Sequence, residues 1–73
     1  MMLKGSDRVK ITLKAARINA GIKQEDAAHE LEIASSTLSF IENGIASPRF
    51  ELVERMCELY NIKIENIKLK EGE

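Results

Sequence analysis

The sequence has few of the residues that small proteins use for cross-links. Among its 73 residues are one cysteine, Cys57, one proline, Pro48, and no tryptophan. A single cysteine excludes an internal disulfide and a multi-cysteine metal site, as is typical of proteins of the reducing cytoplasm. No apolar run approaches the roughly 20 residues that a membrane-spanning helix needs, and residues 1–4 lack a signal-peptide core. We therefore expect a cytoplasmic protein without a membrane segment.

Groups for catalysis or ligand binding are equally scarce. His29 is the single histidine, and it lies between acidic residues with no nucleophile beside it. Cys57 lies on an apolar helical face, where a thiol acts as a small buried hydrophobe. No glycine-rich phosphate loop, metal-ligand spacing or pair of carboxylates stands out. We expect no enzyme activity, no cofactor or metal, and no small-molecule ligand.

Composition and length indicate one small helical domain. Hydrophobic residues make up 44% of the chain and charged residues 32%, which fits a folded protein near the lower size limit for a single core. The net charge of −1 is unevenly distributed. Residues 1–23 carry six Lys or Arg and one acidic residue, whereas residues 24–73 carry five and eleven. Such a molecule can steer a polyanion toward one end, although ordinary solvated helix surface gives the same pattern.

The first half of the chain shows two helical patterns. Thr12 is a typical N-cap, and the helix that follows it should end at Gly21. Its inner face is predicted to contain Leu13, Ala16, Arg17 and Ala20. A second helix opens near Gln24 with acidic residues in its first turn, which suit the helix dipole. The buried side of this second helix is predicted to contain Ala27, Ala28 and Leu31.

Two further helices are predicted in the second half. One runs from about Ser35 or Ser36 to Asn43 and is closed by Gly44. For the next, Ser47 and Pro48 predict the N-cap and the first helical position, and Asn61 a left-handed end. Its core face is predicted to contain Phe50, Val53, Met56, Cys57 and Tyr60. The last apolar segment forms either a short helix around residues 64–68 or a strand-like tail.

Together these features resemble the lambda-repressor-like family of helix-turn-helix domains, also called the XRE or Cro/C-repressor type. The resemblance covers residues 11 to 69, and residues 11–17 look like small phage or prophage regulators of low-GC bacteria. The residues that carry it are Leu13–Arg17, Gly21–Gln24, Ala28, Leu31, Ser36–Ser39, Ile41–Gly44, Pro48, Asn61 and Ile62. It implies an all-α fold of four to five helices with a central helix-turn-helix. The domain would span residues 12–69, between an extension or arm at 1–11 and a tail at 70–73.

The resemblance implies a sequence-specific transcriptional regulator, expected to be a repressor, that binds double-stranded operator DNA as a homodimer. The recognition helix, about residues 35–43, would enter the major groove. Helical geometry sets its outer arc at about 140° wide. The arc contains Ser35, Ser36, Ser39, Phe40 and Asn43. Serines discriminate bases poorly compared with Arg, Asn or Gln, and an exposed aromatic ring such as that of Phe40 equally suits a protein interface.

Other contacts with the DNA backbone are implied by the resemblance. Gln24 at the start of the second helix would contact a phosphate, where free backbone N–H groups favour an anion. Asn43 is a second backbone contact, and Arg49 would reach a phosphate or the minor groove. The plainer interpretation of each is ordinary helix-end or surface chemistry. Lys4, Arg8 and Lys10 form either a short arm on the duplex or a free tail.

Two residues have an implied structural role, and three depart from the family pattern. Arg17 and Glu42 would form a buried ion pair that sets the angle of the recognition helix. Lys23 and Ala34 stand where Ser or Thr usually caps a helix, so Ser35 is expected to cap the recognition helix instead. Glu32 replaces the usual glycine of the turn, which must then avoid or strain into a left-handed conformation.

The sequence leaves the dimer surface and a second function open. Candidate subunit contacts form two alternative patches, and all six residues equally suit the protein's own core. These are Leu52, Met56 and Leu59, or Ile64, Ile67 and Leu69. Because residues 24–73 are acidic and the recognition arc is uncharged, the alternative function is a protein-interaction module, such as an antitoxin or anti-repressor component, with weak or no DNA reading.

Overall fold

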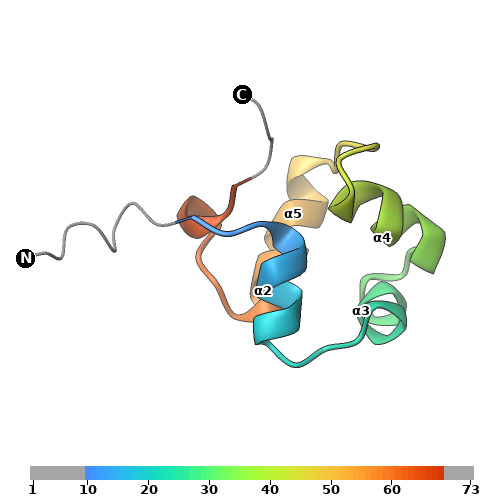
Figure 1. The fold of residues 1–73 in the computed structure, drawn as a ribbon, viewed down its shortest axis with the longest axis horizontal. Helices are drawn as coiled ribbons and strands as arrows, with labels where there is room; N and C mark the ends of the chain where they lie inside the picture. Colours follow the sequence, from blue (N-terminus) through green and yellow to red (C-terminus); the bar gives the residue numbers. More distant parts are fainter. Residues whose placement is uncertain (1–9, 69–73) are drawn as a thin grey trace, which may run out of the picture.

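A computed structural model describes residues 10–68, and this part of the chain is all-α (Figure 1). It contains four α-helices and one short 3-10 helix, as predicted. The elements are α2 (Leu13–Asn19), α3 (Gln24–Leu31), α4 (Ser35–Glu42), α5 (Phe50–Tyr60) and η1 (Ile64–Asn66). The helix-turn-helix consists of α3 and α4. Lys4, Arg8 and Leu69 lie outside the described residues, and with them most of the predicted arm and the tail.

Two helices have N-caps other than the predicted ones. The backbone N–H of Ala15 donates to Thr12 Oγ1 over 3.0 Å, which confirms the cap of α2. At α4, Ala34 occupies the N-cap without a side-chain bond and Ser35 is already helical, so the prediction that Ser35 caps this helix is wrong. The predicted start of α5 at Ser47 and Pro48 is also wrong, because Arg49 is the N-cap. The preceding loop is held against α4 through residues 45 and 46, so the chain turns into a helix only later.

A single hydrophobic core joins all the helices. Ala27 and Ala28 are fully buried, and their small size lets α3 approach α4 and α5 closely. The core residues are Leu13, Ala16, Ala27, Ala28, Leu31, Leu38, Ile41, Val53, Met56, Cys57, Tyr60 and Ile67. Two predicted core residues are exposed instead: Ala20, which lies at the C-cap of α2, and Phe50, the first residue of α5. Both lie at a helix end, where the neighbouring helices no longer cover them.

The two ends of the described chain pair with each other. The Ile11 N–H donates to the Asn66 carbonyl over 3.0 Å, and the Lys68 N–H donates to the Ile11 carbonyl over 2.8 Å. The last apolar segment thus contains the short helix η1 and, after it, the extended residue Ile67. The predicted short helix and the predicted strand-like tail are each confirmed in part. Met56 and Ile67 are buried in the core, and neither is available for contact with a second subunit.

The turn between α3 and α4 contains a strained residue. Glu32 has φ 60° and ψ 42°, the left-handed region in which a side chain with a Cβ is disfavoured. Asn61, which ends α5, has φ 58°, but asparagine tolerates this conformation better. Glu32 also places a negative charge at the C-terminus of α3, where the helix dipole disfavours it.

Replacing Glu32 with glycine should stabilise the protein. The substitution removes the left-handed strain and the unfavourable charge, and we expect the free energy of unfolding to rise by about 1 kcal/mol in urea denaturation. Glu32→Gln removes the charge but keeps the strain, so it should recover less. Asn61→Gly is the matched control at a tolerant residue and should gain little. If the free energy of unfolding of Glu32→Gly did not exceed that of Glu32→Gln, the backbone of Glu32 would not be strained.

Candidate nucleic-acid interface

The end of α4 is fixed by a buried ion pair. Glu42 is the last residue of α4, and its carboxylate accepts from Arg17 Nε over 2.7 Å and from Arg17 Nη2 over 3.1 Å. Only 9% of the Arg17 side chain and 1% of the Glu42 side chain are exposed. The hydrogen bond to Glu42 raises the pKa of Arg17 above its ordinary value, against the opposing effect of burial. The structure thus contains the pair that the resemblance implied, and it connects α2 to α4.

Arg17 and Gln24 extend this pair into a network. Arg17 Nη1 donates to the Ile22 carbonyl over 2.8 Å, which holds the turn between α2 and α3. Gln24, the first residue of α3, donates from Nε2 to Glu42 Oε1 over 3.1 Å. Glu42 therefore accepts three hydrogen bonds from α2 and α3 together. The sequence did not predict the contact between Gln24 and Glu42.

Tyr60 lies beside this network. Its side chain is buried at the end of α5, and its hydroxyl has no hydrogen-bond partner among residues 10–68. Burial raises the pKa of Tyr60 to about 12, and the negative charge of Glu42 adds to the shift. An unpaired buried hydroxyl reduces the free energy of unfolding, because it loses hydrogen bonds to water without replacement. The sequence assigned Tyr60 to the core, but it gave no sign of this unpaired group.

The outer side of α4 consists of short polar side chains and one aromatic ring. Leu38 and Ile41 are buried on the inner side. Ser35, Ser36 and Asn43 are exposed and Ser39 is half-buried, while Phe40 is 49% exposed. Asn43 Nδ2 donates to Ser39 Oγ over 3.4 Å, so these two side chains lie together. Thr37 is also exposed, and the predicted arc missed it because it lies on the flank of the first turn.

The start of α3 provides a mixed environment for an anion. Gln24 is half-buried and uses one of its two amide hydrogens on Glu42, which leaves the other hydrogen and the backbone N–H groups. Lys23 at the N-cap is exposed, but Glu25 and Asp26 occupy the first turn. Attraction by Lys23 and repulsion by Glu25 and Asp26 therefore compete for an anion at this helix end.

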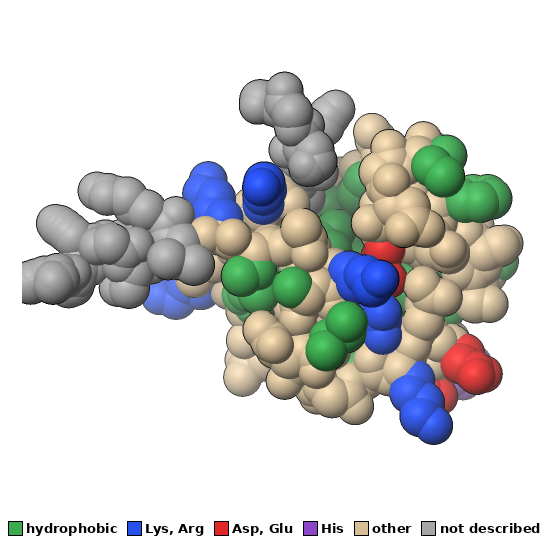
Figure 2. Space-filling view, viewed as in Figure 1, with side chains coloured by type: hydrophobic (Ala, Val, Ile, Leu, Met, Phe, Trp, Pro, Cys, Tyr) green, Lys and Arg blue, Asp and Glu red, His purple; other side chains and the backbone are tan. Residues whose placement is uncertain are grey.

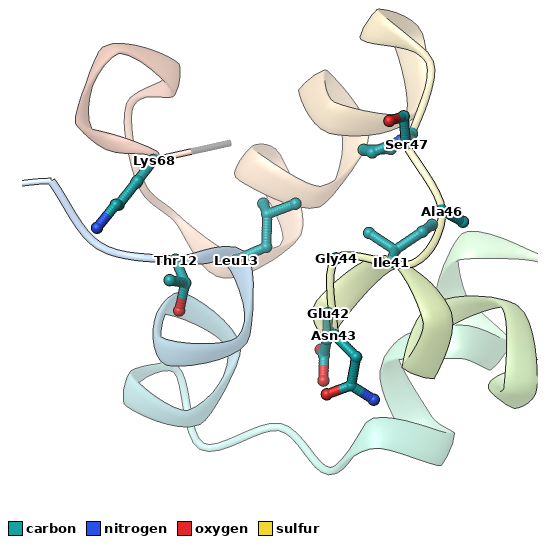
Figure 3. Close-up of a pocket in the computed structure, with 10 residues that line it drawn as sticks. Thr12, Leu13, Ile41, Glu42, Asn43, Gly44, Ala46, Ser47 and Lys68 are labelled. Atoms are coloured by element: carbon teal, nitrogen blue, oxygen red, sulfur yellow. The ribbon is translucent and has the colours of Figure 1, made fainter. Parts of the chain in front are cut away.

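A groove runs between the start of α2 and the loop after α4 (Figure 3). Its volume is about 550 Å³. Lining residues include the apolar Leu13 and Ile41, the polar Asn43 and Ser47, and Lys68. The lining carboxylate, that of Glu42, is already paired with Arg17. In residues 10–68 no group of three or more His, Cys, Asp or Glu side chains is arranged to hold a metal ion.

Comparisons with known proteins agree with this geometry. A family model described as helix-turn-helix matches residues 13–67. The chain belongs to the helix-turn-helix family. It is 31% identical over 65 residues to an uncharacterized HTH-type transcriptional regulator of Methanocaldococcus jannaschii, covering 89% of this chain and 98% of that protein. No solved structure gives a significant match.

Charge is distributed unevenly around the helix-turn-helix. Figure 2 shows Lys and Arg side chains around the paired ends of the described chain, on α2 and at the turn to α3, with few acidic side chains on the same face. By contrast, α5 carries Glu51, Glu54 and Glu58, all exposed, with Arg55. Arg49 is exposed at the N-cap of α5. No helix of residues 10–68 is both long and apolar enough to cross a bilayer.

Removing one partner of the ion pair should destabilise the protein more than removing both partners together. Arg17→Met leaves the buried Glu42 carboxylate without its main partner, and we expect a loss of about 3–5 kcal/mol in the free energy of unfolding. The double variant Arg17→Met with Glu42→Leu removes both charges and should recover most of that loss. Chemical denaturation followed by circular dichroism measures both effects. If the loss of stability in the double variant equalled the sum of the losses in Arg17→Met and Glu42→Leu alone, the two residues would not be coupled.

The buried tyrosine predicts a loss of stability at alkaline pH. The pKa of Tyr60 is about 12 in the folded protein against 10.0 for an ordinary tyrosine. The unfolded state therefore releases its proton first. Stability is retained below pH 10 and falls by about 2–3 kcal/mol as the pH rises to 12.

This effect can be measured directly, because Tyr60 is the one tyrosine and the chain has no tryptophan. Phenolate absorbance should titrate near pH 12 in the native protein and near pH 10 in denaturant. Tyr60→Phe should lose the alkaline effect of this group and be at least as stable as the parent at neutral pH. Titration of the native protein near pH 10 would show that the hydroxyl is not buried.

Proposed function

We propose that the protein is a transcriptional regulator that binds operator DNA as a homodimer, with α4 in the major groove. It would repress transcription by occupying the operator rather than by a chemical reaction. Family membership supports DNA binding and a regulatory role in general. The observation that carries the proposal is α4 itself. Its outer side presents short polar side chains and Phe40, while its C-terminal end is fixed by the network of Arg17, Gln24 and Glu42.

The proposed contacts divide into phosphate and base contacts. Gln24 and Arg49 would bind phosphates, Gln24 through its second amide hydrogen and the N-terminal N–H groups of α3. Asn43 would contact the backbone where α4 ends. The remaining residues of the outer arc would contact base edges. They are Ser35, Ser36, Ser39 and Phe40. Because serine hydroxyls both donate and accept, they discriminate bases weakly. Much of the specificity would then come from bridging water and from DNA shape.

A protein-interaction module with weak or no DNA reading is the second candidate. The observation that favours it is the absence of charged side chains from the outer arc of α4, together with the exposed aromatic ring of Phe40. An antitoxin or anti-repressor component could use such a surface against another protein. The two functions differ in their response to DNA and salt.

Fluorescence anisotropy on DNA from the protein's own promoter should separate the two candidates. A regulator should bind a discrete promoter fragment at least about 1,000-fold more tightly than scrambled DNA. Its affinity should fall linearly with the logarithm of salt concentration, because binding releases counterions. No preference for any upstream fragment, even at low salt, would reject the DNA-reading function in favour of the interaction module.

Two substitutions test the proposed docking of α4. Gln24→Ala should weaken binding to specific and scrambled DNA alike, because it affects phosphate contact. Ser36→Ala should weaken specific binding alone, about tenfold, which corresponds to about 1.4 kcal/mol. Glu58→Gln on the exposed face of α5 is the control and should leave affinity unchanged. If the Gln24→Ala and Ser36→Ala proteins remain folded with the parent affinity, the docking is wrong.

A further inference from the structure

The segment that leads from α4 to α5 exposes two large hydrophobic side chains. Ile45 is 71% exposed and Phe50 is 63% exposed. They are five residues apart, so the chain between them spans at most roughly 18 Å. We call Ile45, Phe50 and the charged neighbours of Phe50, which are Arg49 and Glu51, the α4–α5 surface.

This surface is continuous with the end of α4. The backbone N–H groups of Ile45 and Ala46 both donate to the Phe40 carbonyl, over 2.8 and 3.1 Å. The loop is therefore held firmly against the last turn of α4. Figure 2 shows hydrophobic side chains at the molecular surface over α4 and the loop that follows it.

The core does not need these side chains. It is complete without Ile45 and Phe50, since the buried cluster draws on α2, α3, α4, α5 and the Ile67 segment. A small domain gains nothing in its own stability from large apolar groups in water. Exposed apolar side chains that gather in one place are typical of interaction sites.

We propose that the α4–α5 surface is the contact with a second copy of this chain. The inference rests on the proposed homodimer and names its interface. In a two-fold contact the same patch meets itself, so a patch of one charge sign would repel its copy. Arg49 and Glu51 flank Phe50 with opposite signs. The surface therefore carries no net charge and does not repel its copy, and Ile45 and Phe50 form its apolar centre.

The position of this contact suits a DNA-binding dimer. Ile45 lies three residues after Glu42, the last residue of α4, so the C-terminal ends of both α4 helices lie near the two-fold axis.

The size of the surface predicts a weak dimer in the absence of DNA. Ile45 and Phe50 together offer roughly 250 Å² of exposed apolar area per subunit. A standard interface buries about 800 Å² per partner. The free protein should therefore dimerise in the micromolar range or more weakly. DNA that holds two copies side by side would complete the assembly, so binding to the promoter should be cooperative.

Sedimentation equilibrium of the full chain, over a concentration series without DNA, tests the interface. The parent protein should show a monomer–dimer equilibrium, and Ile45→Ser with Phe50→Ser should shift its dissociation constant at least tenfold toward monomer. Both side chains are exposed, so the thermal midpoint should change little. Ile18→Ser is the matched control, because Ile18 is 56% exposed on α2, outside this surface. This control should dimerise like the parent.

The outcomes keep this proposal separate from the proposed function. A parent protein that stays monomeric at millimolar concentration, or a double-serine variant that dimerises like the parent, overturns the interface. Equal loss in the Ile18→Ser control also overturns it. Dimerisation through this surface without any promoter binding would uphold the interface and reject the DNA-reading function. On the promoter fragment, the double-serine variant should lose cooperativity.

Discussion

Glu42 brings a carboxylate into the interior at the end of α4, where water can no longer solvate it. Three hydrogen bonds from Arg17 and Gln24 replace that water, and they come from the two helices that precede α4 in the chain. An eight-residue helix without a side-chain cap is not stable alone. The angle of α4 therefore depends on this buried charge, whose geometry tolerates less variation than apolar packing does. Leu38 and Ile41 pack α4 onto the core, and Glu42 fixes the orientation of α4 relative to α2 and α3.

The network separates a buried framework from the outer side of α4, which we propose as the DNA-reading surface. Framework residues lie behind α4 and tie the three helices together, whereas the outer side of α4 carries only short polar groups and Phe40. Gln24 belongs to the framework through its amide, which donates to Glu42, and to the proposed interface through its place at the N-terminus of α3. In the proposed docking, the exposed acidic side chains of α5 would be repelled by phosphates and would favour an orientation with α5 away from the duplex.

Periodicity predicted the fold well, because burial follows the helical repeat. The inner face of α3, the cap at Thr12 and the left-handed Asn61 were all predicted correctly. Errors occurred at helix ends, where Ala20 and Phe50 are exposed although they continue an apolar pattern. The start of α5 was placed too early, since the Ser-Pro signal is local and the hydrogen bonds to the Phe40 carbonyl are not. The contact between Gln24 and Glu42 depends on side-chain rotamers and helix packing, which no sequence pattern encodes.

The pairing of Ile11 with Ile67 also bears on how the protein can be handled or joined to others. The pairing is parallel, so residue 10 lies beside residue 66 and residue 68 lies beside residue 12. Lys68 also lines the groove that Asn43 and Gly44 line at the end of α4 (Figure 3). An affinity handle or a fused domain attached before residue 10 would therefore start next to η1, whereas one attached after residue 68 would start beside this groove.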